Sequence, residues 1–229
     1  MTKDANFDPR VPLLLLLSAT TGLVDAASVL GLGKVFTANM TGNVVFLGFA
    51  VAGAPGFAWP PFVVAIASFL AGALLAGRVA KRHADRSERR WLMIAAVVET
   101  TLLWLAAAIS LTFGVAAPAG LILFAIIALT GVAMGFRNAT IRQLKIPDLT
   151  TTVLTLTLTG LVADSVAAGG TNPNARRRIG AVLAIFAGAA IGAVLILRFG
   201  LAAPLAVAGA LVLFGTMAYF AYPFETPSH

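Results

Sequence analysis

The sequence predicts an all-α polytopic membrane protein, a single transmembrane domain over residues 1–229. Of its residues, 59% are hydrophobic and 11% are charged, whereas a soluble protein carries about 25% charged residues. Apolar runs of about 20 residues recur along the chain, and a helix of that length crosses the roughly 30 Å hydrocarbon core of a bilayer. The runs lack the polar–apolar alternation that is typical of a transmembrane β-barrel.

The basic composition, a net charge of +7, does not indicate nucleic-acid binding, because the cations cluster in loops between apolar runs. The chain has no cysteine, and its two histidines, His83 and His229, stand in a loop and at the tail. Disulfides, thiolate metal sites and histidine clusters are therefore not expected. The sequence contains no nucleophile–base pair, HExxH, phosphate loop or nucleotide fingerprint. We therefore expect no enzymatic activity, no metal, no cofactor and no nucleic-acid partner.

Six long apolar runs and two short ones follow a polar head that ends near Arg10. The first long run is too long for the apolar part of a signal peptide, so we expect it to be a retained helix. The expected elements lie at about 11–32, 40–53 (short), 61–80, 91–113, from the turn at 114–118 to 136, 149–166 (short), 179–197 and 201–222. Charged stretches or stretches rich in glycine and proline separate most of them.

The distribution of lysine and arginine indicates that only the six long runs cross the membrane. With both termini cytoplasmic, this topology places fourteen of the sixteen cations inside and leaves only Lys34 and Arg198 outside. If all eight runs crossed, either the cluster at 78–90 or the cluster at 176–178 would face outward. The two short runs are therefore predicted to be re-entrant half-helices, which enter the membrane and return to the same side.

This topology gives both halves of the chain the same order of elements: long, short re-entrant, long, long. The halves enter from opposite sides, so the prediction is an inverted 3+3 repeat, with repeat one at about 11–113 and repeat two at about 117–222. At an offset of 109 residues, Thr21-Gly22 aligns with Thr130-Gly131. A rival internal match places 21–24 on 159–162. The topology therefore carries more of this prediction than either alignment.

The two short helices begin at polar stretches within apolar surroundings, and these stretches form the candidate substrate site. The residues are Asn39, Thr41, Gly42 and Asn43 in the first half, and Asp148, Thr150, Thr151 and Thr152 in the second. Asn39 or Thr41, and Asp148 or Thr150, are suitable N-cap residues. Helix N-termini near mid-membrane favour a small polar or anionic ligand, although Asp148 would repel an anion. The alternative interpretation is that these residues only cap short helices packed in the bundle.

Two acids, Asp25 and Glu99, lie within apolar runs, where an ionised carboxylate costs about 2.5–3.5 kcal/mol on insertion scales. Each is a candidate for proton coupling; the alternative is a protonated acid that holds two helices together. Arg137 and Asn138 are expected at a cytoplasmic helix end. Snorkelling of the arginine is the first interpretation there, and a gate or an anion contact is the second.

Two small-residue motifs predict close packing between helices. They are Gly131-x-x-x-Gly135 and Gly188-x-x-x-Gly192. Such contacts form within a subunit or between subunits, so a homodimer is one expectation.

Three stretches carry the most distinctive residues of the chain. They are Ser18-Ala-Thr-Thr-Gly22-Leu-Val-Asp25-Ala-Ala-Ser28, Phe36-Thr-Ala-Asn39-Met-Thr41-Gly42-Asn43 and Gly135-Phe-Arg137-Asn138-Ala. They resemble the YoaK-like family of uncharacterised bacterial inner-membrane proteins. The resemblance implies a six-span protein of the bacterial inner membrane and names no substrate. The half-helices also resemble those of nucleobase and anion transporters with inverted repeats, which is an analogy of architecture.

Together these features predict a small secondary transporter for a small polar or anionic solute. Asp25 is the favoured proton-linked acid, and the expected partners are the solute and the lipid bilayer. A channel lined by two facing re-entrant segments is the second hypothesis, and a membrane scaffold that transports nothing is the third.

Overall fold

A computed structural model describes residues 10–82, 88–113, 120–143, 154–172 and 174–221. Over these ranges the chain forms eight α-helices and one 3-10 helix, without a strand. The elements are α1 (Arg10–Gly31), α2 (Met40–Val51), α3 (Trp59–Arg82), α4 (Glu88–Phe113), α5 (Leu121–Gln143), α6 (Leu154–Ala163), η1 (Val166–Ala168), α7 (Ala175–Phe199) and α8 (Ala202–Ala221). All except α2, α6 and η1 are long and apolar enough to cross a membrane, which confirms the six expected spans.

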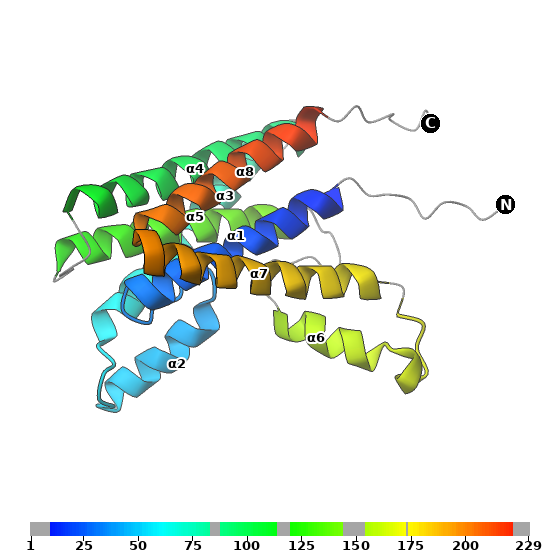
Figure 1. Ribbon diagram of the computed structural model, residues 1–229, viewed down its shortest axis with the longest axis horizontal. Helices are drawn as coiled ribbons and strands as arrows, with labels where there is room; N and C mark the ends of the chain where they lie inside the picture. Colours follow the sequence, from blue (N-terminus) through cyan, green and yellow to red (C-terminus); the bar gives the residue numbers. More distant parts are fainter. Residues whose placement is uncertain (1–9, 83–87, 114–119, 144–153, 173, 222–229) are drawn as a thin grey trace.

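The six long helices form a bundle, with α1 the most buried of them. The most extensive helix contacts are those of α1 with α7 and of α3 with α5; α4 packs on α5 and α8, and α8 also packs on α1. Figure 1 shows that α1 begins and α8 ends at one end of the bundle, where α7 also begins. The helices that surround α1 therefore hold its polar residues away from the lipid-facing surface.

Glycines allow the two tightest helix pairs to approach closely. Gly188 and Gly192 face α1, and Gly131 and Gly135 face α3, so both motifs act as packing surfaces, as the sequence predicts. A Cβ added at Gly188 would overlap the backbone carbonyl of Ala19 on α1. Because the obstacle is backbone rather than a flexible side chain, a larger residue there would force the two helices apart.

The two short helices lie on one flank of the bundle, each packed on the long helix that follows it. In Figure 1, α2 and α6 begin near the middle of the long axis, and they end toward opposite ends of the bundle. A turn after α1, at Gly33 (φ 81°) and Lys34 (φ 67°), leads into the segment before α2. The left-handed region is uncommon for a residue other than glycine, so Lys34 marks a sharply constrained turn.

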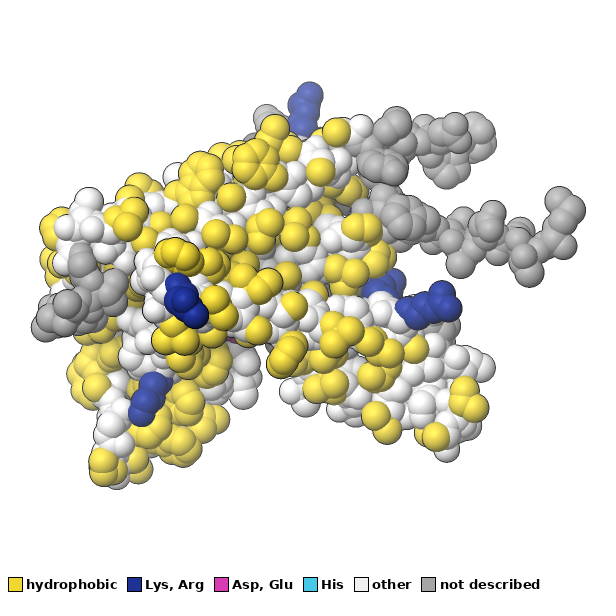
Figure 2. Space-filling model, viewed as in Figure 1, with side chains coloured by type: hydrophobic (Ala, Val, Ile, Leu, Met, Phe, Trp, Pro, Cys, Tyr) yellow, Lys and Arg dark blue, Asp and Glu magenta, His cyan; other side chains and the backbone are white. Residues whose placement is uncertain are grey.

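The surface of the bundle is apolar. Exposed large side chains include Leu70, Phe186, Leu197 and Phe214. Figure 2 shows apolar side chains across the middle of the molecule, with Lys and Arg toward its ends. Such an extended apolar surface suits hydrocarbon rather than water.

The end of α5 differs from the sequence prediction. We expected this span to end near 136, but α5 continues to Gln143, so that Arg137 and Asn138 lie within it. Their polarity suggested a helix end in water. The structure instead neutralises Arg137 inside the bundle, and the Asn138 side chain donates back to the Met134 carbonyl at 2.8 Å.

Candidate functional site

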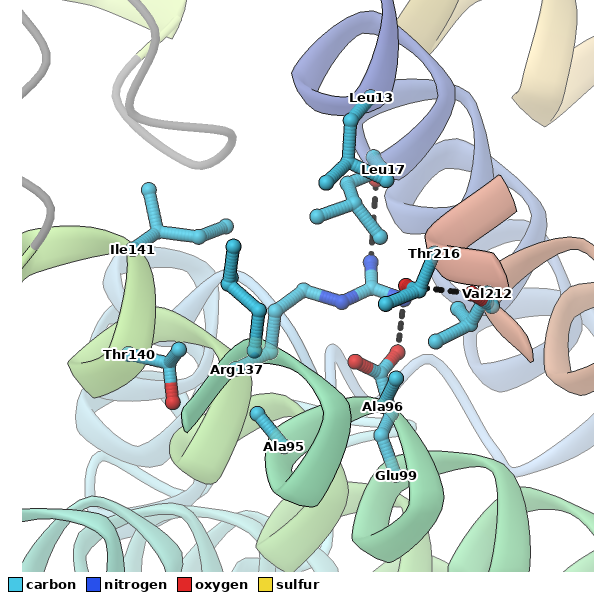
Figure 3. Close-up of a pocket in the computed structure, with 11 residues that line it drawn as sticks. Leu13, Leu17, Ala95, Ala96, Glu99, Arg137, Thr140, Ile141, Val212 and Thr216 are labelled. Carbon is cyan, nitrogen blue, oxygen red and sulfur yellow. Dashed lines mark hydrogen bonds and ion pairs between the residues drawn. The ribbon is translucent and has the colours of Figure 1, made fainter. Parts of the chain in front are cut away.

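A buried ion pair links α4 to α5. The Arg137 guanidinium contacts the Glu99 carboxylate, and the two side chains are only 2% and 3% exposed. Nη1 of Arg137 also donates to the Leu17 carbonyl and to the Thr21 hydroxyl of α1, each at 3.0 Å. Figure 3 shows the guanidinium reaching between Leu17 and Glu99. The pair thus ties three membrane-spanning helices together.

The snorkelling interpretation of Arg137 is therefore wrong. A snorkelling arginine extends toward water at a helix end. Arg137 lies more than a turn before the end of α5, and its side chain turns inward to Glu99. The physical reason is charge pairing: a carboxylate on the neighbouring helix compensates a charge that would otherwise have to reach the membrane surface.

One donor of this guanidinium has no hydrogen-bond partner among the described residues. Nη1 and Nη2 are bonded, whereas the buried Nε of Arg137 is not. Leaving a buried donor unpaired costs about 1–3 kcal/mol. Because Arg137 also lines a cavity between membrane-spanning helices, its Nε–H is a candidate ligand-binding atom.

A small cavity borders the ion pair. Its lining comes from α1, α4, α5 and α8: Leu13, Leu17, Leu92, Ala95, Ala96, Glu99, Arg137, Thr140, Ile141, Val212 and Thr216. Its volume of about 20 Å³ gives room for one or two waters. The hydroxyls of Thr140 and Thr216 donate to carbonyls of their own helices, at 2.9 and 2.8 Å. The cavity is therefore small and largely apolar, with two charges in its wall.

A second polar cluster forms where α1 meets the segment that leads to α2. The half-buried Asp25 of α1 accepts a hydrogen bond from the backbone N–H of Ala38 at 3.2 Å. The fully buried side chain of Asn43 accepts from the N–H of Phe36 at 2.9 Å and donates to its carbonyl at 2.5 Å. The fully buried hydroxyl of Thr37 has no hydrogen-bond partner among the described residues. Asp25 and Asn43 thus fix the segment that carries Thr37.

The predicted site residues of the first half have separate roles in this cluster. Asn39 occupies the N-cap position of α2, which is one of the two positions that the sequence predicts, but its side chain makes no capping hydrogen bond. Asn39 and Thr41 are exposed, and Gly42 packs so closely on Phe36 that a Cβ would lie 2.6 Å from the ring. Thr41 falls within the first turn of α2 rather than at its cap.

The predicted site residues of the second half, Asp148, Thr150, Thr151 and Thr152, lie outside the described residues. The pairing of the two half-helix tips therefore stays a prediction. The Glu99–Arg137 pair and Asp25 lie along the same helix, α1. Thr21, which accepts a hydrogen bond from Arg137, stands one turn before Asp25 on the same helix face.

The sequence did not indicate the partner of Glu99, nor a further ion pair between the turn after α6 and α7. Arg178 donates from Nη1 to Asp164 at 2.7 Å and to the Gly160 carbonyl at 2.6 Å. A run of three arginines marked this region only as a cytoplasmic loop. In the sequence, only the opposite charges of the two residues link Glu99 to Arg137 or Asp164 to Arg178. Charge alone does not identify which of several oppositely charged residues is the partner.

A family model described as a protein of unknown function, DUF1275, matches residues 13–218. The chain belongs to this family. It is also 32% identical over 155 residues to the UPF0700 transmembrane protein YoaK of Bacillus subtilis (strain 168), an alignment that covers 68% of this chain and 67% of YoaK. No solved structure matches the chain. The resemblance predicted from the sequence is thus confirmed, and the DUF1275 match spans both polar clusters.

Proposed function

We propose that this protein is a secondary transporter of a small polar or anionic solute, coupled to protons, in the bacterial inner membrane with both termini cytoplasmic. The observation that carries the proposal is the Glu99–Arg137 pair. Two opposite charges lie buried between membrane-spanning helices, beside a cavity. Ionisable residues inside such helices typically mark a solute or proton pathway.

An inverted repeat of two 3+3 halves is part of the proposal, and the helix contacts support it. Suppose that α1–α4 of the first half correspond in order to α5–α8 of the second. The contact of α1 with α7 must then have a counterpart between α5 and α3. The contact of α4 with α5 must likewise have a counterpart between α8 and α1. Both counterparts occur, and the α1–α7 and α3–α5 contacts are of nearly equal extent. Two halves related in this way supply the two equivalent arrangements that alternating access requires.

The register of the close contacts supports the same correspondence. A Cβ at Gly192 would meet the Leu23 carbonyl, and a Cβ at Gly72 would meet the Val132 carbonyl. Leu23 and Val132 stand 109 residues apart, the offset that also relates the Thr-Gly pairs of the two halves. The Thr100 hydroxyl donates to the Gly209 carbonyl at 3.1 Å, again across 109 positions, as expected for residues that meet near a twofold axis.

The length and direction of the short helices support re-entrant segments. α2 has 12 residues and α6 has 10, so at about 1.5 Å per residue each covers only about half of a bilayer core. Both begin near the middle of the bundle and end toward opposite ends (Figure 1). The proposed solute path runs past the tip of α2, with Asn39, Thr41, Gly42 and Asn43, toward the tip of α6.

The small cavity beside Arg137 favours a transporter over a channel. With space for one or two waters and mostly apolar walls, it is too narrow and too apolar for an open, water-filled pore. The channel alternative predicts flux that rises linearly with solute concentration and needs no proton gradient.

The proposal is tested by reconstituting the purified protein in liposomes that contain a pH-sensitive dye. Nitrate, acetate, phosphate and uracil serve as probes under an inward proton gradient, with protein-free liposomes as the control for passive leak. We expect saturable, proton-linked entry of at least one probe. Linear flux without proton entry would favour a channel, and no protein-dependent flux of any probe would overturn the transporter proposal.

A further inference from the structure

We infer that Arg137 forms part of the solute site and binds a small, monovalent, planar oxyanion, which takes the place of the Glu99 carboxylate when Glu99 is protonated. This inference rests on the proposed function, for which it names the solute class and the proton-coupled step.

A carboxylate already occupies the Arg137 guanidinium. Nη2 of Arg137 contacts the Glu99 carboxylate, while Nη1 is held by the Leu17 carbonyl and the Thr21 hydroxyl. Those α1 contacts fix the plane of the guanidinium. A planar anion that approached the same edge would find the donors already oriented, because the guanidinium fork matches carboxylates and similar oxyanions.

Glu99 uses only half of the guanidinium fork of Arg137. The Nε–H and one Nη2–H of an arginine point in the same direction and together hold two oxygens of one planar anion. Glu99 contacts Nη2 through Oε1, whereas the buried Nε has no partner among the described residues. A solute oxyanion that bridged Nε and Nη2 would satisfy the unpaired donor and make the two-point contact that Glu99 does not make.

The charges around the cavity balance only while Glu99 is ionised. Among the residues that line the cavity, Arg137 and Glu99 are the only charged ones; α1 and α8 contribute apolar side chains and Thr216. Within the described part of the chain, Asp25 also interacts electrostatically with Arg137, but the Ala38 N–H holds the Asp25 carboxylate at the segment before α2. Protonation of Glu99 would therefore leave one uncompensated positive charge in the bundle. One monovalent anion restores neutrality, so a proton and an anion bind together with no net charge.

The size of the cavity limits the anion that the site can take. The present cavity accommodates water only, and its walls include Leu13, Leu17, Ile141 and Val212. When Glu99 turns away from Arg137, the space of one carboxylate group becomes free. The site therefore suits an anion of a few heavy atoms, such as nitrate or acetate, rather than a bulky or divalent one.

The test measures binding to the purified protein in detergent, separately from transport. Ligands that bind the folded state raise the unfolding midpoint with concentration. Sodium nitrate and sodium acetate are titrated at mildly acidic and mildly alkaline pH, with sodium chloride and sodium sulfate as references. We expect nitrate and acetate to stabilise the wild type at acidic pH and much less at alkaline pH, with little effect of chloride or sulfate.

Two variants make the test specific. Glu99→Gln removes the competing carboxylate, so we expect nitrate binding at both pH values, at least about tenfold tighter than in the wild type at alkaline pH. The double variant Glu99→Gln/Arg137→Gln removes both charges at nearly constant volume, and it should fold without responding to nitrate. Equal nitrate responses in the double variant and the wild type would overturn the inference, as would equal effects of chloride and nitrate.

The inference and the proposed function fail in different ways. Saturable, proton-linked flux without Arg137-dependent binding of planar anions would overturn the inference and leave the transporter proposal standing. Arg137-dependent binding without protein-dependent flux would support the binding site and overturn transport. The detergent assay and the liposome assay therefore report on separate claims.

Discussion

Glu99 and Arg137, 38 positions apart in the sequence, form an ion pair that is nearly excluded from solvent between α4 and α5. Taking both charges out of water is costly, and their attraction offsets this only while both partners are present. Replacing both by neutral groups of similar size is often tolerated, whereas removing one leaves the other uncompensated. Under the proposed function, protonation of Glu99 would remove its charge and release Arg137 from the pair.

The first prediction concerns stability. Arg137→Gln alone should lower the free energy of unfolding by about 3–5 kcal/mol, because Glu99 remains buried without its partner. The double variant Glu99→Gln/Arg137→Gln should lose much less. Unfolding in mixed micelles measures both variants, and a double variant as unstable as Arg137→Gln would contradict the coupling between the two charges.

The second prediction concerns the packing of α1 on α7. Gly188→Ala places a methyl group against the Ala19 backbone and should destabilise the protein by about 1–3 kcal/mol. Gly77→Ala is the matched control, because Gly77 lies within a helix and faces open space. That substitution should stabilise by up to about 1 kcal/mol through helix propensity. Equal effects of the two substitutions would refute the close approach of α1 and α7.

The third prediction concerns the segment before α2. Asn43→Ala removes both side-chain bonds to the Phe36 backbone and should cost about 1–3 kcal/mol. It should also speed amide hydrogen exchange near Phe36. Asn39→Ala is the control, since Asn39 is exposed and makes no capping bond. If Asn39→Ala accelerated exchange as much as Asn43→Ala, the role assigned to Asn43 would be wrong.

The fourth prediction concerns Asp25. Asn in place of Asp keeps an oxygen that accepts from the Ala38 N–H, but it cannot carry a proton. Asp25→Asn should therefore fold and still exchange solute across liposomes at equal pH, while proton-driven uptake is lost. Undiminished proton-driven uptake would remove Asp25 from the coupling step.

The fifth prediction concerns the re-entrant course of α2. The chain has no cysteine, so single cysteines can be introduced without background labelling. Lys34→Cys and Gly53→Cys flank α2 and should react with an impermeant thiol reagent from the same side of the membrane. Lys81→Cys should react only from the opposite side. Labelling of positions 34 and 53 from opposite sides would mean that α2 crosses the bilayer.

The sequence was sufficient to predict the six spans and both short helices, because long apolar runs and the asymmetry of Lys and Arg reflect the bilayer directly. The start of α2 at Met40 also agrees with the prediction. The end of α5 was not predictable in this way. An arginine after an apolar run is typical of a helix end in water. Only the fold shows that the carboxylate of Glu99, 38 residues earlier, compensates the charge of Arg137.

The candidate site was predictable only in part. Asp25 and Glu99 stood out because acids are rare in apolar helices, and both lie in polar clusters of the structure. The roles of Asn39 and Asn43 depend on where the preceding segment folds back, which a polar motif does not specify. Asn43 holds the Phe36 backbone, while Asn39 faces outward.

The most direct test of the account is uptake of isotope-labelled nitrate into liposomes, comparing the wild type with Glu99→Gln. The wild type should accumulate nitrate under an inward proton gradient, in a saturable manner. Glu99→Gln should exchange nitrate across the membrane at equal pH but fail to accumulate it when the proton gradient is applied. Proton-driven accumulation by Glu99→Gln at the wild-type level would contradict the claim that release of Arg137 by protonated Glu99 couples the proton to the anion.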